Sequence, residues 1–421
     1  MASERCEKLD LLLKGGRVID PANHVDAVRD VGIRKGKVAR VEEAIPADAS
    51  AHVVDVSGLL VTPGLIDIHI HAYITRQPRR PGLFMASLNA DAHFPGSGVT
   101  TCVDTGSAGS EEMAHFRETV IEGSVTRILA YVNISAPGMG DPEQNIRTFD
   151  VDAAAGAATA HADVVVGIKT AHYWPREPFD AEHPPWESVE RAVQAGERCG
   201  MPVMVDFWPR PPERSYPDLL LKMLRPGDIH THVFARQFPV IDEKGKVYPY
   251  MYEARERGIW FDLGHGSASF WFRNGARAIA EGFVPDSIST DLHMGNIQGP
   301  VFSMLDTMSK CLVMGMPLEE VIYRSTVTPA RAIRRPELGT LSVGVEADVA
   351  VLEHLKGAFS YRDCGHTRMD GEDRLVCKLT LRKGEVVWDR DAMTVPGWED
   401  APPDYWEVPV VPVKVRRHWR E

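Results

Sequence analysis

Two histidines one residue apart end the apolar segment V-T-P-G-L-I-D-I-H-I-H-A-Y at residues 61–73. Alternate residues of a β-strand point to the same face, so His69 and His71 would present both imidazole rings on one side. The pair is either an ordinary strand edge with two polar residues or a pair of metal ligands. The segment by itself does not distinguish these interpretations.

Side chains that can bind metal ions also end several later apolar segments of the chain. They are histidines, carboxylates and one lysine, namely Lys169, Asp206, His230, His232, His265, Asp291 and His293. A buried charged side chain costs several kcal/mol unless it is paired or coordinated, so packing alone explains this distribution poorly. We therefore interpret His69 and His71 as metal ligands.

Eight segments of apolar and β-branched residues recur through the middle of the chain. They cover residues 65–71, 99–106, 127–135, 164–171, 202–208, 228–234, 259–266 and 286–293. Two of the helix-period stretches between them, W-E-S-V-E-R-A-V-Q-A-G-E-R-C-G and N-G-A-R-A-I-A-E-G, end at glycine, as helices often do. Continuous apolar strands separated by helices predict an α/β protein with a closed (β/α)₈ TIM barrel. Catalytic residues of such barrels lie at the carboxyl ends of the strands, where these polar residues are found.

Short segments of alternating apolar and polar residues flank this region on both sides. Examples are D-V-G-I-R-K-G-K-V-A-R-V near the start and L-V-C-K-L-T-L-R-K-G-E-V-V-W-D near the end. We expect the two ends to pair as one small β-sandwich domain. The predicted division is residues 1–62 and 336–392 for this domain, 63–335 for the metal-binding barrel and 393–421 for a proline-rich, extended tail.

Composition excludes two classes of partner. The formal net charge of −12 over 421 residues disfavours a general nucleic-acid or anionic-membrane binder, because phosphate binding needs clustered positive charge. No apolar run reaches the ~18 residues of a membrane span. The first residues contain acids and no signal-peptide core, which predicts a cytoplasmic protein. We expect a small-molecule substrate and a homo-oligomer, without nucleic acid or membrane as a partner.

The chain resembles the amidohydrolase superfamily, and within it the dihydroorotase and deacetylase-like branch. The resemblance covers most of the chain and is carried by P-G-L-I-D-I-H-I-H (63–71), G-I-K (167–169), L-R-P-G-D-I-H-T-H-V-F (224–234), D-L-G-H-G-S-A-S-F (262–270) and S-I-S-T-D-L-H (287–293). It implies a barrel with a small split β-domain. It also implies one or two divalent metal ions as cofactors, with zinc expected and manganese as the alternative.

The resemblance implies a role for each ligand. His69, His71 and Asp291 would hold one ion, a carboxylated Lys169 would bridge to a second ion, and His232 would bind that second ion. For Lys169, a salt bridge to a neighbouring carboxylate is the alternative.

One position departs from the family pattern, because Asp206 stands where the family usually has a histidine. An aspartate oxygen binds zinc at about the same distance as an imidazole nitrogen, and it favours harder ions such as Mn²⁺. The site is then either an intact two-metal centre or a weakened one with a single working metal.

Other polar and aromatic residues follow the strand ends. His230 shares a face with His232 and is expected to be structural, whereas His265 and His293 contact the substrate or anchor loops. The remaining candidates either line the substrate pocket or pack the loops; they are Tyr73, His172, Tyr173, Trp208 and Arg210.

A bound metal ion lowers the pKa of its water toward ~7, so hydroxide becomes available at neutral pH. Asp291 would take the proton and pass it to the leaving group. The expected reaction is hydrolysis of an amide (N-acyl or cyclic) or an ester of a small molecule through a metal-bound hydroxide. Dihydroorotase activity is not expected, because Tyr73 stands where those enzymes usually carry an arginine. The alternatives are a non-catalytic scaffold that has lost its metals and a metal-dependent lyase or decarboxylase.

Overall fold

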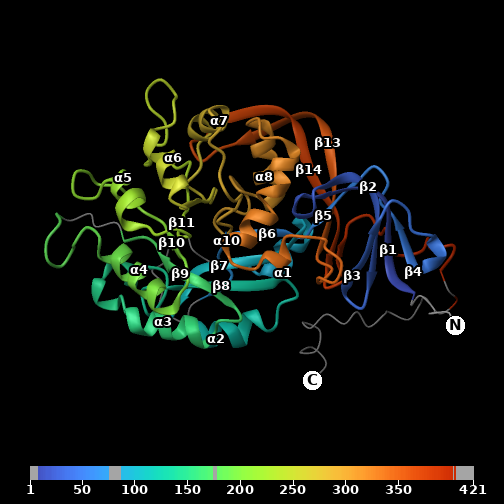
Figure 1. The fold of residues 1–421 in the computed structure, drawn as a ribbon, viewed down its shortest axis with the longest axis horizontal. Coiled ribbons are helices and arrows are strands. Elements are labelled where there is room, and N and C mark those ends of the chain that lie inside the picture. Colours follow the sequence, from blue (N-terminus) through green and yellow to red (C-terminus); the bar gives the residue numbers. More distant parts are fainter. Residues whose placement is uncertain (1–7, 75–86, 174–177, 402, 404–421) are drawn as a thin grey trace.

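The computed structural model of the chain describes residues 8–74, 87–173, 178–401 and 403. Two sheets form the framework of these parts (Figure 1). Seven parallel strands come from the middle of the chain, and eight strands come from its two ends. The chain thus has the two units that the sequence predicts.

The seven-stranded sheet is ordered as the chain runs, with each strand parallel to the next. Its strands are β6 (Leu65–Ile70), β7 (Val99–Gly109), β8 (Arg127–Asn133), β9 (Val165–Thr170), β10 (Val203–Val205), β11 (Ile229–His230) and β12 (Trp260–Phe261). All residues of β6 and β9 are buried, as expected for strands covered on both faces.

Residues 286–293 close the barrel without forming a continuous strand. Single parallel bridges join Asp262 to Ser287 on one side and Ile70 to Leu292 on the other. Asp291 has a left-handed backbone conformation with φ of 50°, which interrupts the extended chain between these contacts. The predicted eight-unit barrel is therefore confirmed, and its last unit differs from prediction only in being irregular.

Helices lie between the barrel strands and after the last barrel segment. They are α1 (Ala90–His93), α2 (Met113–Phe116), α3 (Val151–Ala160), α4 (Glu187–Cys199), α5 (Tyr216–Asp218), α6 (Pro249–Glu256), α7 (Phe272–Ala280), α8 (Met304–Val313), α9 (Leu318–Tyr323) and α10 (Val327–Ala332). Single π-helical turns, η4 (Arg117–Ile121) and η7 (Leu219–Met223), continue α2 and α5. Short 3₁₀ turns occur at η1 (Pro21–Asn23), η2 (Ala47–Ala49), η3 (Pro95–Ser97), η5 (Asp141–Gln144), η6 (Ile146–Thr148) and η8 (Pro336–Leu338).

Helix α4 shows why these segments fold as predicted. Its buried residues Val189, Ala192 and Ala195 recur at helical spacing, and Gly200 ends the helix in the left-handed conformation. None of the helices that the structure describes is both long and apolar enough to cross a bilayer.

The eight-stranded sheet joins the two ends of the chain beside the barrel (Figure 1). Its strands are β1 (Leu9–Asp20), β2 (Val25–Arg34), β3 (Lys37–Glu42), β4 (Ser50–Asp55), β5 (Leu60–Pro63), β13 (Val349–Arg362), β14 (Arg368–Arg382) and β15 (Glu385–Asp389). Strand β5 pairs with β13, and residues from both ends share one core that includes Leu13, Val18, Val349 and Leu379. The predicted small β-domain built from both ends is confirmed.

The β13–β14 hairpin is longer than the alternating sequence pattern indicates. Its far end reaches the barrel, where the Asp363 carboxylate accepts a hydrogen bond from the backbone N–H of Phe272 at 3.2 Å. The backbone N–H of Leu375 donates to the Ser309 hydroxyl on α8 at 3.0 Å. The small domain therefore packs directly on elements that surround the barrel opening.

Candidate metal centre

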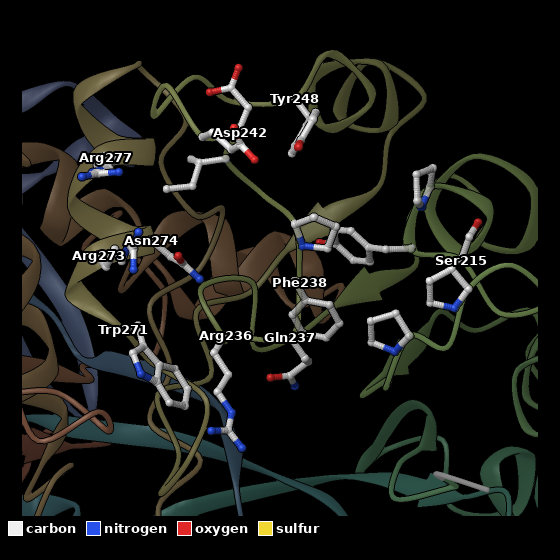
Figure 2. Close-up of a pocket in the computed structure, with 17 residues that line it drawn as sticks. Ser215, Arg236, Gln237, Phe238, Asp242, Tyr248, Trp271, Arg273, Asn274 and Arg277 are labelled. Carbon is white, nitrogen blue, oxygen red and sulfur yellow. The ribbon is translucent and has the colours of Figure 1, made fainter. Parts of the chain in front are cut away.

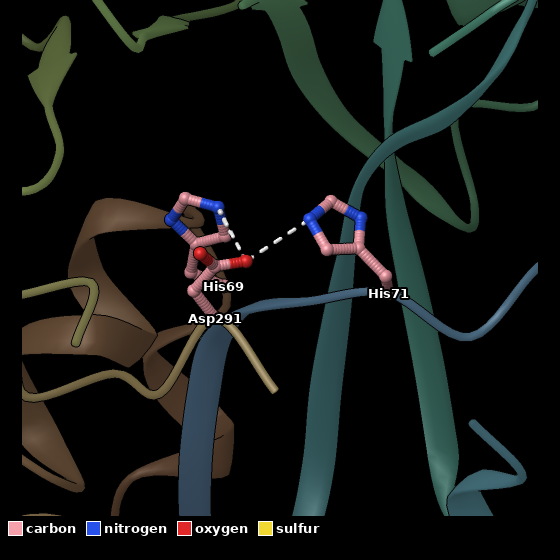
Figure 3. Close-up of side chains that lie close together, drawn as sticks. All are labelled: His69, His71 and Asp291. Atoms are coloured by element: carbon pink, nitrogen blue, oxygen red, sulfur yellow. Dashed lines mark ion pairs between the residues drawn. The ribbon is translucent and has the colours of Figure 1, made fainter. Parts of the chain in front are cut away.

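Three donor groups converge at the carboxyl end of the barrel. The donor atoms of His69, His71 and Asp291 all lie within 4.8 Å of one another (Figure 3). Oδ1 of Asp291 is 3.1 Å from Nε2 of His71 and 3.7 Å from Nε2 of His69. Two imidazole nitrogens and one carboxylate oxygen in this arrangement are a ligand set for a divalent ion.

The outer nitrogens of both histidines are held by other side chains. Nδ1 of His69 is 2.8 Å from the Thr231 hydroxyl, which in turn donates to the Asp262 carboxylate at 2.7 Å. Nδ1 of His71 is 3.0 Å from the Ser107 hydroxyl. Such contacts orient a metal-binding imidazole, and here they leave both Nε2 atoms facing the centre.

The protonation states also fit a metal ion. Burial, with a smaller contribution from Lys169, lowers the pKa of His69 to about 3, so its imidazole is neutral as a ligand must be. Burial raises the pKa of the Asp291 carboxyl, but His69 and His71 outweigh it and hold that pKa well below its usual range. Oδ1 of Asp291 is buried without a hydrogen-bond partner among the described residues, as an oxygen intended for a cation would be.

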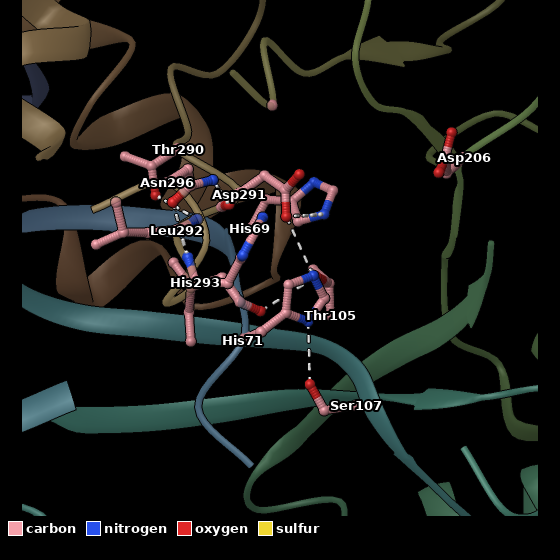
Figure 4. A network of polar contacts seen from close by, with 12 residues as sticks. His69, His71, Thr105, Ser107, Asp206, Thr290, Asp291, Leu292, His293 and Asn296 are labelled. Carbon is pink, nitrogen blue, oxygen red and sulfur yellow. Dashed lines mark hydrogen bonds and ion pairs between the residues drawn. The ribbon is translucent and has the colours of Figure 1, made fainter. Parts of the chain in front are cut away.

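A second set of donors lies beside the first. Lys169 ends β9, Asp206 follows β10 and His232 follows β11. Nε2 of His232 is 3.9 Å from Oδ2 of Asp206, and its Nδ1 is 2.5 Å from the carbonyl oxygen of Gly264. The His232 ring centre is 4.9 Å from that of His69, whereas Figure 4 shows Asp206 apart from the first set.

Lys169 is buried, and the aliphatic part of its side chain packs against Gly106. The Lys169 Nζ atom has no hydrogen-bond partner in the described part of the chain. Burial lowers the pKa of this amine, although the Asp206 and Asp291 carboxylates act in the opposite direction. A Cβ atom on Gly106, whose φ is +78°, would lie 2.8 Å from Cβ of Lys169. Gly106 thus lets the lysine pass into the barrel.

The backbone is in an unfavourable conformation at two proposed ligands. His232 and Asp291 have left-handed φ values of 63° and 50°. Non-glycine residues in this region cost about 1–3 kcal/mol and persist where the surrounding structure enforces them, often at functional sites. Gly266 packs closely here too, because a Cβ atom on it would lie 2.6 Å from Oδ2 of Asp291.

His172 forms a partly buried ion pair with Glu143 at the edge of the centre. Its Nδ1 atom is 2.9 Å from Oε2 of Glu143, whose Oε1 accepts a hydrogen bond from Asn133 at 2.8 Å. Burial lowers the pKa of His172, but the Glu143 carboxylate outweighs it and raises the pKa to about 9. His172 is therefore an imidazolium at neutral pH.

The other candidate histidines have different surroundings. Nε2 of His265 is 2.9 Å from the Lys310 ammonium on α8, and the ring is fully buried. Nδ1 of His293 accepts from the backbone N–H of Gly295 at 3.0 Å, so this histidine anchors its loop. Both ring nitrogens of His230 are buried without a partner among the described residues.

Two of the residues predicted to line the substrate pocket, Tyr73 and Tyr173, are buried. The Tyr73 hydroxyl donates to Glu112 at 2.5 Å and lies 2.7 Å from Nδ1 of His115, and the side chain is buried. The Tyr173 hydroxyl donates to the carbonyl oxygen of Pro184 at 2.9 Å. The hydroxyls of both tyrosines are thus directed into the protein.

Trp208 and Arg210 lie on the loop after β10. The Arg210 guanidinium lies 4.3 Å from the Phe179 ring centre. Arg214 is buried and donates to the carbonyl oxygens of Tyr173 at 2.8 Å and Trp208 at 3.2 Å. This arginine therefore holds two loops together at the barrel opening.

Comparison with known proteins defines the family. The sequence pattern of the amidohydrolase family matches residues 272–386. A deacetylase of Brucella anthropi is 32% identical over 343 residues, which cover 78% of this chain and 80% of the relative. The chain belongs to the amidohydrolase family. The predicted resemblance and enzyme class are confirmed: the protein is a metal-dependent hydrolase of carbon–nitrogen bonds.

Solved structures of other amidohydrolases share the architecture. An adenine deaminase superimposes with a TM-score of 0.79 at 26% identity, covering 91% of this chain and 100% of that one. A dihydroorotase superimposes with a TM-score of 0.76 at 28% identity, covering 90% and 97% respectively. The barrel with its additional β-domain is therefore an amidohydrolase fold throughout.

Several supporting residues of this amidohydrolase were missed by the sequence reasoning. They are Ser107, Asn133, Glu143, Arg214, Thr231 and Asp262. Thr231, between the two histidines of D-I-H-T-H, and Asp262, the first residue of D-L-G-H-G-S-A-S-F, lie in segments that carried a signal. Other contacts join separate segments; Ser107, for example, holds His71 across 36 residues.

Proposed function

We propose that this amidohydrolase is a deacylase, which hydrolyses the amide bond of a small N-acylated compound. The convergence of His69, His71 and Asp291 within 4.8 Å, beside the buried Lys169, is the observation that carries the proposal. The similarity to a deacetylase supports this amide as the substrate class. Cyclic amides and O-acyl esters are the alternatives that the same chemistry allows.

The ligand assignment follows the two sets of donors. His69, His71 and Asp291 would hold the first ion, and Asp206 with His232 would hold the second. Lys169, carboxylated on Nζ, would bridge the two; the effect of both the Asp206 and the Asp291 carboxylates on the pKa of its buried amine supports this role. We propose zinc as the ion, with manganese as the alternative that the oxygen of Asp206 would favour. When bound, the ions acidify water and polarise the substrate carbonyl.

Asp291 would move the proton. Its low pKa keeps the carboxylate charged at neutral pH, and its Oδ1 atom faces the two imidazoles, so Oδ2 is the oxygen available to a proton. Oδ2 would accept a proton from the attacking water and donate it to the leaving nitrogen as the carbon–nitrogen bond breaks. The products are a carboxylate and an amine, which together contain the atoms of the amide and one water.

Charges near the centre favour an anionic substrate. His172 is an imidazolium held by Glu143, and we propose that it contacts a negative group of the substrate. Tyr73 does not replace the arginine of dihydroorotases, because its hydroxyl is bonded to Glu112 and His115. An N-acyl amino acid or a similar N-acylated acid fits these charges; dihydroorotate carries the same charge and is disfavoured only because Tyr73 occupies the position of the arginine.

A substrate panel tests the proposal. Metal-loaded protein is incubated with N-acetyl amino acids, O-acetyl hydroxy acids, dihydroorotate and hydantoins, and released acetate and amine are quantified. Equal amounts of acetate and amine from an N-acetyl acid are expected, and Asp291→Asn should lower kcat by about 10²–10⁴-fold. Turnover of cyclic amides alone would identify a cyclic amidase instead of a deacylase. Cleavage without addition of water to the products would identify a lyase.

A further inference from the structure

A groove of about 770 Å³ lies between loops that follow three barrel strands (Figure 2). It is lined by parts of residues 209–217 after β10, 236–248 after β11 and 271–277 around the start of α7. Among the described residues its lining includes none of the six proposed metal ligands. The groove is therefore a separate candidate binding site on the functional face of the barrel.

Arginines occupy one side of the groove. Arg273 and Arg277 are one helical turn apart on α7, so they share a face with one another. Asn274 donates to the backbone carbonyl oxygens of residues 234–235 at 3.3 and 3.1 Å, which ties the segment before Arg236 to the same helix. All three arginines are exposed, and none forms an ion pair with another described residue. Three unpaired guanidinium groups on one side favour an anion.

The acids of the groove do not neutralise this side. Oδ1 of Asp242 accepts hydrogen bonds from the backbone N–H groups of Lys244 and Lys246, both at 2.8 Å, so this carboxylate stabilises its own turn. Glu243 is the other acid among the lining residues. The groove has three arginines and two acids, so the net charge of its lining is positive. One of the two acids, Asp242, accepts hydrogen bonds from its own turn.

The floor of the groove is apolar but contains polar atoms without partners. Tyr216 stacks on Phe238 with ring centres 4.8 Å apart, and its side chain is 2% exposed. The Tyr216 hydroxyl and Oε1 of Gln237 are buried and have no hydrogen-bond partner among the described residues. A buried polar atom without a partner costs about 1–3 kcal/mol. The aromatic rings of the floor would pack against the apolar part of a ligand.

The groove is connected to the metal centre by a short piece of chain. The backbone N–H of Ala235 donates to the carbonyl oxygen of His232 at 2.8 Å, and Arg236 follows this tight turn directly. The Arg236 guanidinium lies 5.8 Å from the Trp271 ring centre, on the side of the groove where Figure 2 also places Arg273, Asn274 and Arg277. The same turn thus positions a metal-ligand candidate and the first arginine of the groove.

We propose that this groove binds a small organic anion in which a carboxylate is joined to an aromatic or branched apolar group. The carboxylate would contact Arg273 and Arg277, which lie one helical turn apart on α7. The apolar part would pack on aromatic residues of the lining such as Trp271 and Phe238. The bound molecule is either the distal end of the substrate or a separate ligand. Binding is measured without turnover, so the proposal does not depend on the deacylase reaction.

Calorimetric titration of the metal-loaded protein tests the proposal. Phenylacetate is the probe, and 2-phenylethanol is its uncharged counterpart. We expect phenylacetate to bind, 2-phenylethanol to bind at least tenfold more weakly, and the double variant Arg273→Gln/Arg277→Gln to weaken phenylacetate binding about tenfold. The control variant Arg368→Gln/Arg390→Gln removes two exposed arginines of the small β-domain and its border and should leave binding unchanged. Circular dichroism melting of all variants verifies that they fold.

Each outcome decides the proposal. The proposal is overturned if phenylacetate does not bind, or if 2-phenylethanol binds as tightly as phenylacetate. It is also overturned if Arg273→Gln/Arg277→Gln binds phenylacetate as tightly as the unmodified protein, which is the result expected if only the metal centre holds phenylacetate. If binding weakens as expected, KM for the hydrolysed substrate identifies the source of the ligand. A raised KM with unchanged kcat in Arg273→Gln/Arg277→Gln assigns the groove to the substrate's distal end, and an unchanged KM assigns it to a separate ligand.

Discussion

Nε2 of His232 lies 3.9 Å from Oδ2 of Asp206 at the adjacent ends of β11 and β10. Two donors that each bind one zinc ion at ~2.0–2.2 Å are separated by at most ~4.2 Å, so this spacing allows both to hold the same ion. Burial raises the pKa of the Asp206 carboxyl, but the effects of His232, His172 and Lys169 outweigh burial and hold that pKa below its usual value, so Asp206 is an anionic donor. The aspartate at this position is thus compatible with an intact second metal site.

Replacing Asp206 tests that second site. Asp206→Ala should lose about one ion per chain, because it removes an anionic donor from a buried site. Asp206→His should keep both ions, because it supplies an imidazole at the same strand end. Metal content is measured by elemental analysis of dialysed protein. Unchanged metal content in Asp206→Ala would remove Asp206 from the ligand set and make it a supporting hydrogen-bond group.

Carboxylation of Lys169 is expected in the active form. Burial lowers the pKa of this amine, which favours the neutral form that reacts with carbon dioxide. Activity of acid-treated, metal-free protein should therefore return faster when ions are added with bicarbonate than without it. Native mass spectrometry should find one added carbon dioxide per chain. Fully active, metal-loaded protein with an unmodified lysine would contradict this expectation.

Gly106→Ala should damage the site through Lys169. The new Cβ atom would lie 2.8 Å from Cβ of Lys169, and φ of +78° is unfavourable for alanine by roughly 1 kcal/mol. We expect lower stability and reduced occupancy of the second ion, measured by thermal melting and elemental analysis. Gly156→Ala is the matched control, because a Cβ there meets nothing within 4 Å in α3 and should stabilise the helix by about 1 kcal/mol.

Glu143→Gln should remove the charge of His172 at neutral pH. Without the carboxylate, the pKa of His172 should fall from about 9 toward or below its ordinary value near ~6.5. NMR titration of the imidazole resonances measures this shift. KM for an anionic substrate should rise, whereas KM for its uncharged amide analogue should stay constant.

The same pair makes stability depend on pH. Because the folded-state pKa of His172 is raised, its contribution to stability is fully present below about 6.5 and is lost as pH rises toward about 9. The free energy of unfolding is measured with denaturant at several pH values. Its decrease between about pH 6.5 and 9 should be smaller in Glu143→Gln, because the variant lacks the contribution of this ion pair. An unchanged pH profile in the variant would show that Glu143 does not hold the His172 proton.

The structure was most predictable from the sequence where a local residue pattern determines the direction of the side chains. The one-residue spacing of His69 and His71 on an apolar strand places both rings on one face, and the structure has them there. The continuous apolar segments likewise predicted the barrel strands, because strands covered on both faces carry little polar sequence. Residues 286–293 had the same composition but form an irregular segment, since Asp291 turns the chain at that point.

Side-chain directions beyond the strand ends were less predictable. Tyr73 was a candidate for the substrate pocket, yet its hydroxyl is bonded to Glu112 and His115, about 40 residues later in the chain. Glu143 holds His172 across 29 residues and gave no signal at all. Such contacts depend on how loops from different parts of the chain pack together. Neither the composition nor the periodicity of a single sequence predicts that packing.

Removal and stepwise return of metal ions tests the central claim most directly. Protein stripped with a chelator is titrated with Zn²⁺ or Mn²⁺ in the presence of bicarbonate, while bound ions per chain and hydrolysis of an N-acetyl acid are measured on the same samples. We expect an inactive metal-free protein whose activity rises with the ions bound and is complete at about two per chain. Full amide hydrolysis by metal-free protein, or a chain that binds no ions at all, would contradict it.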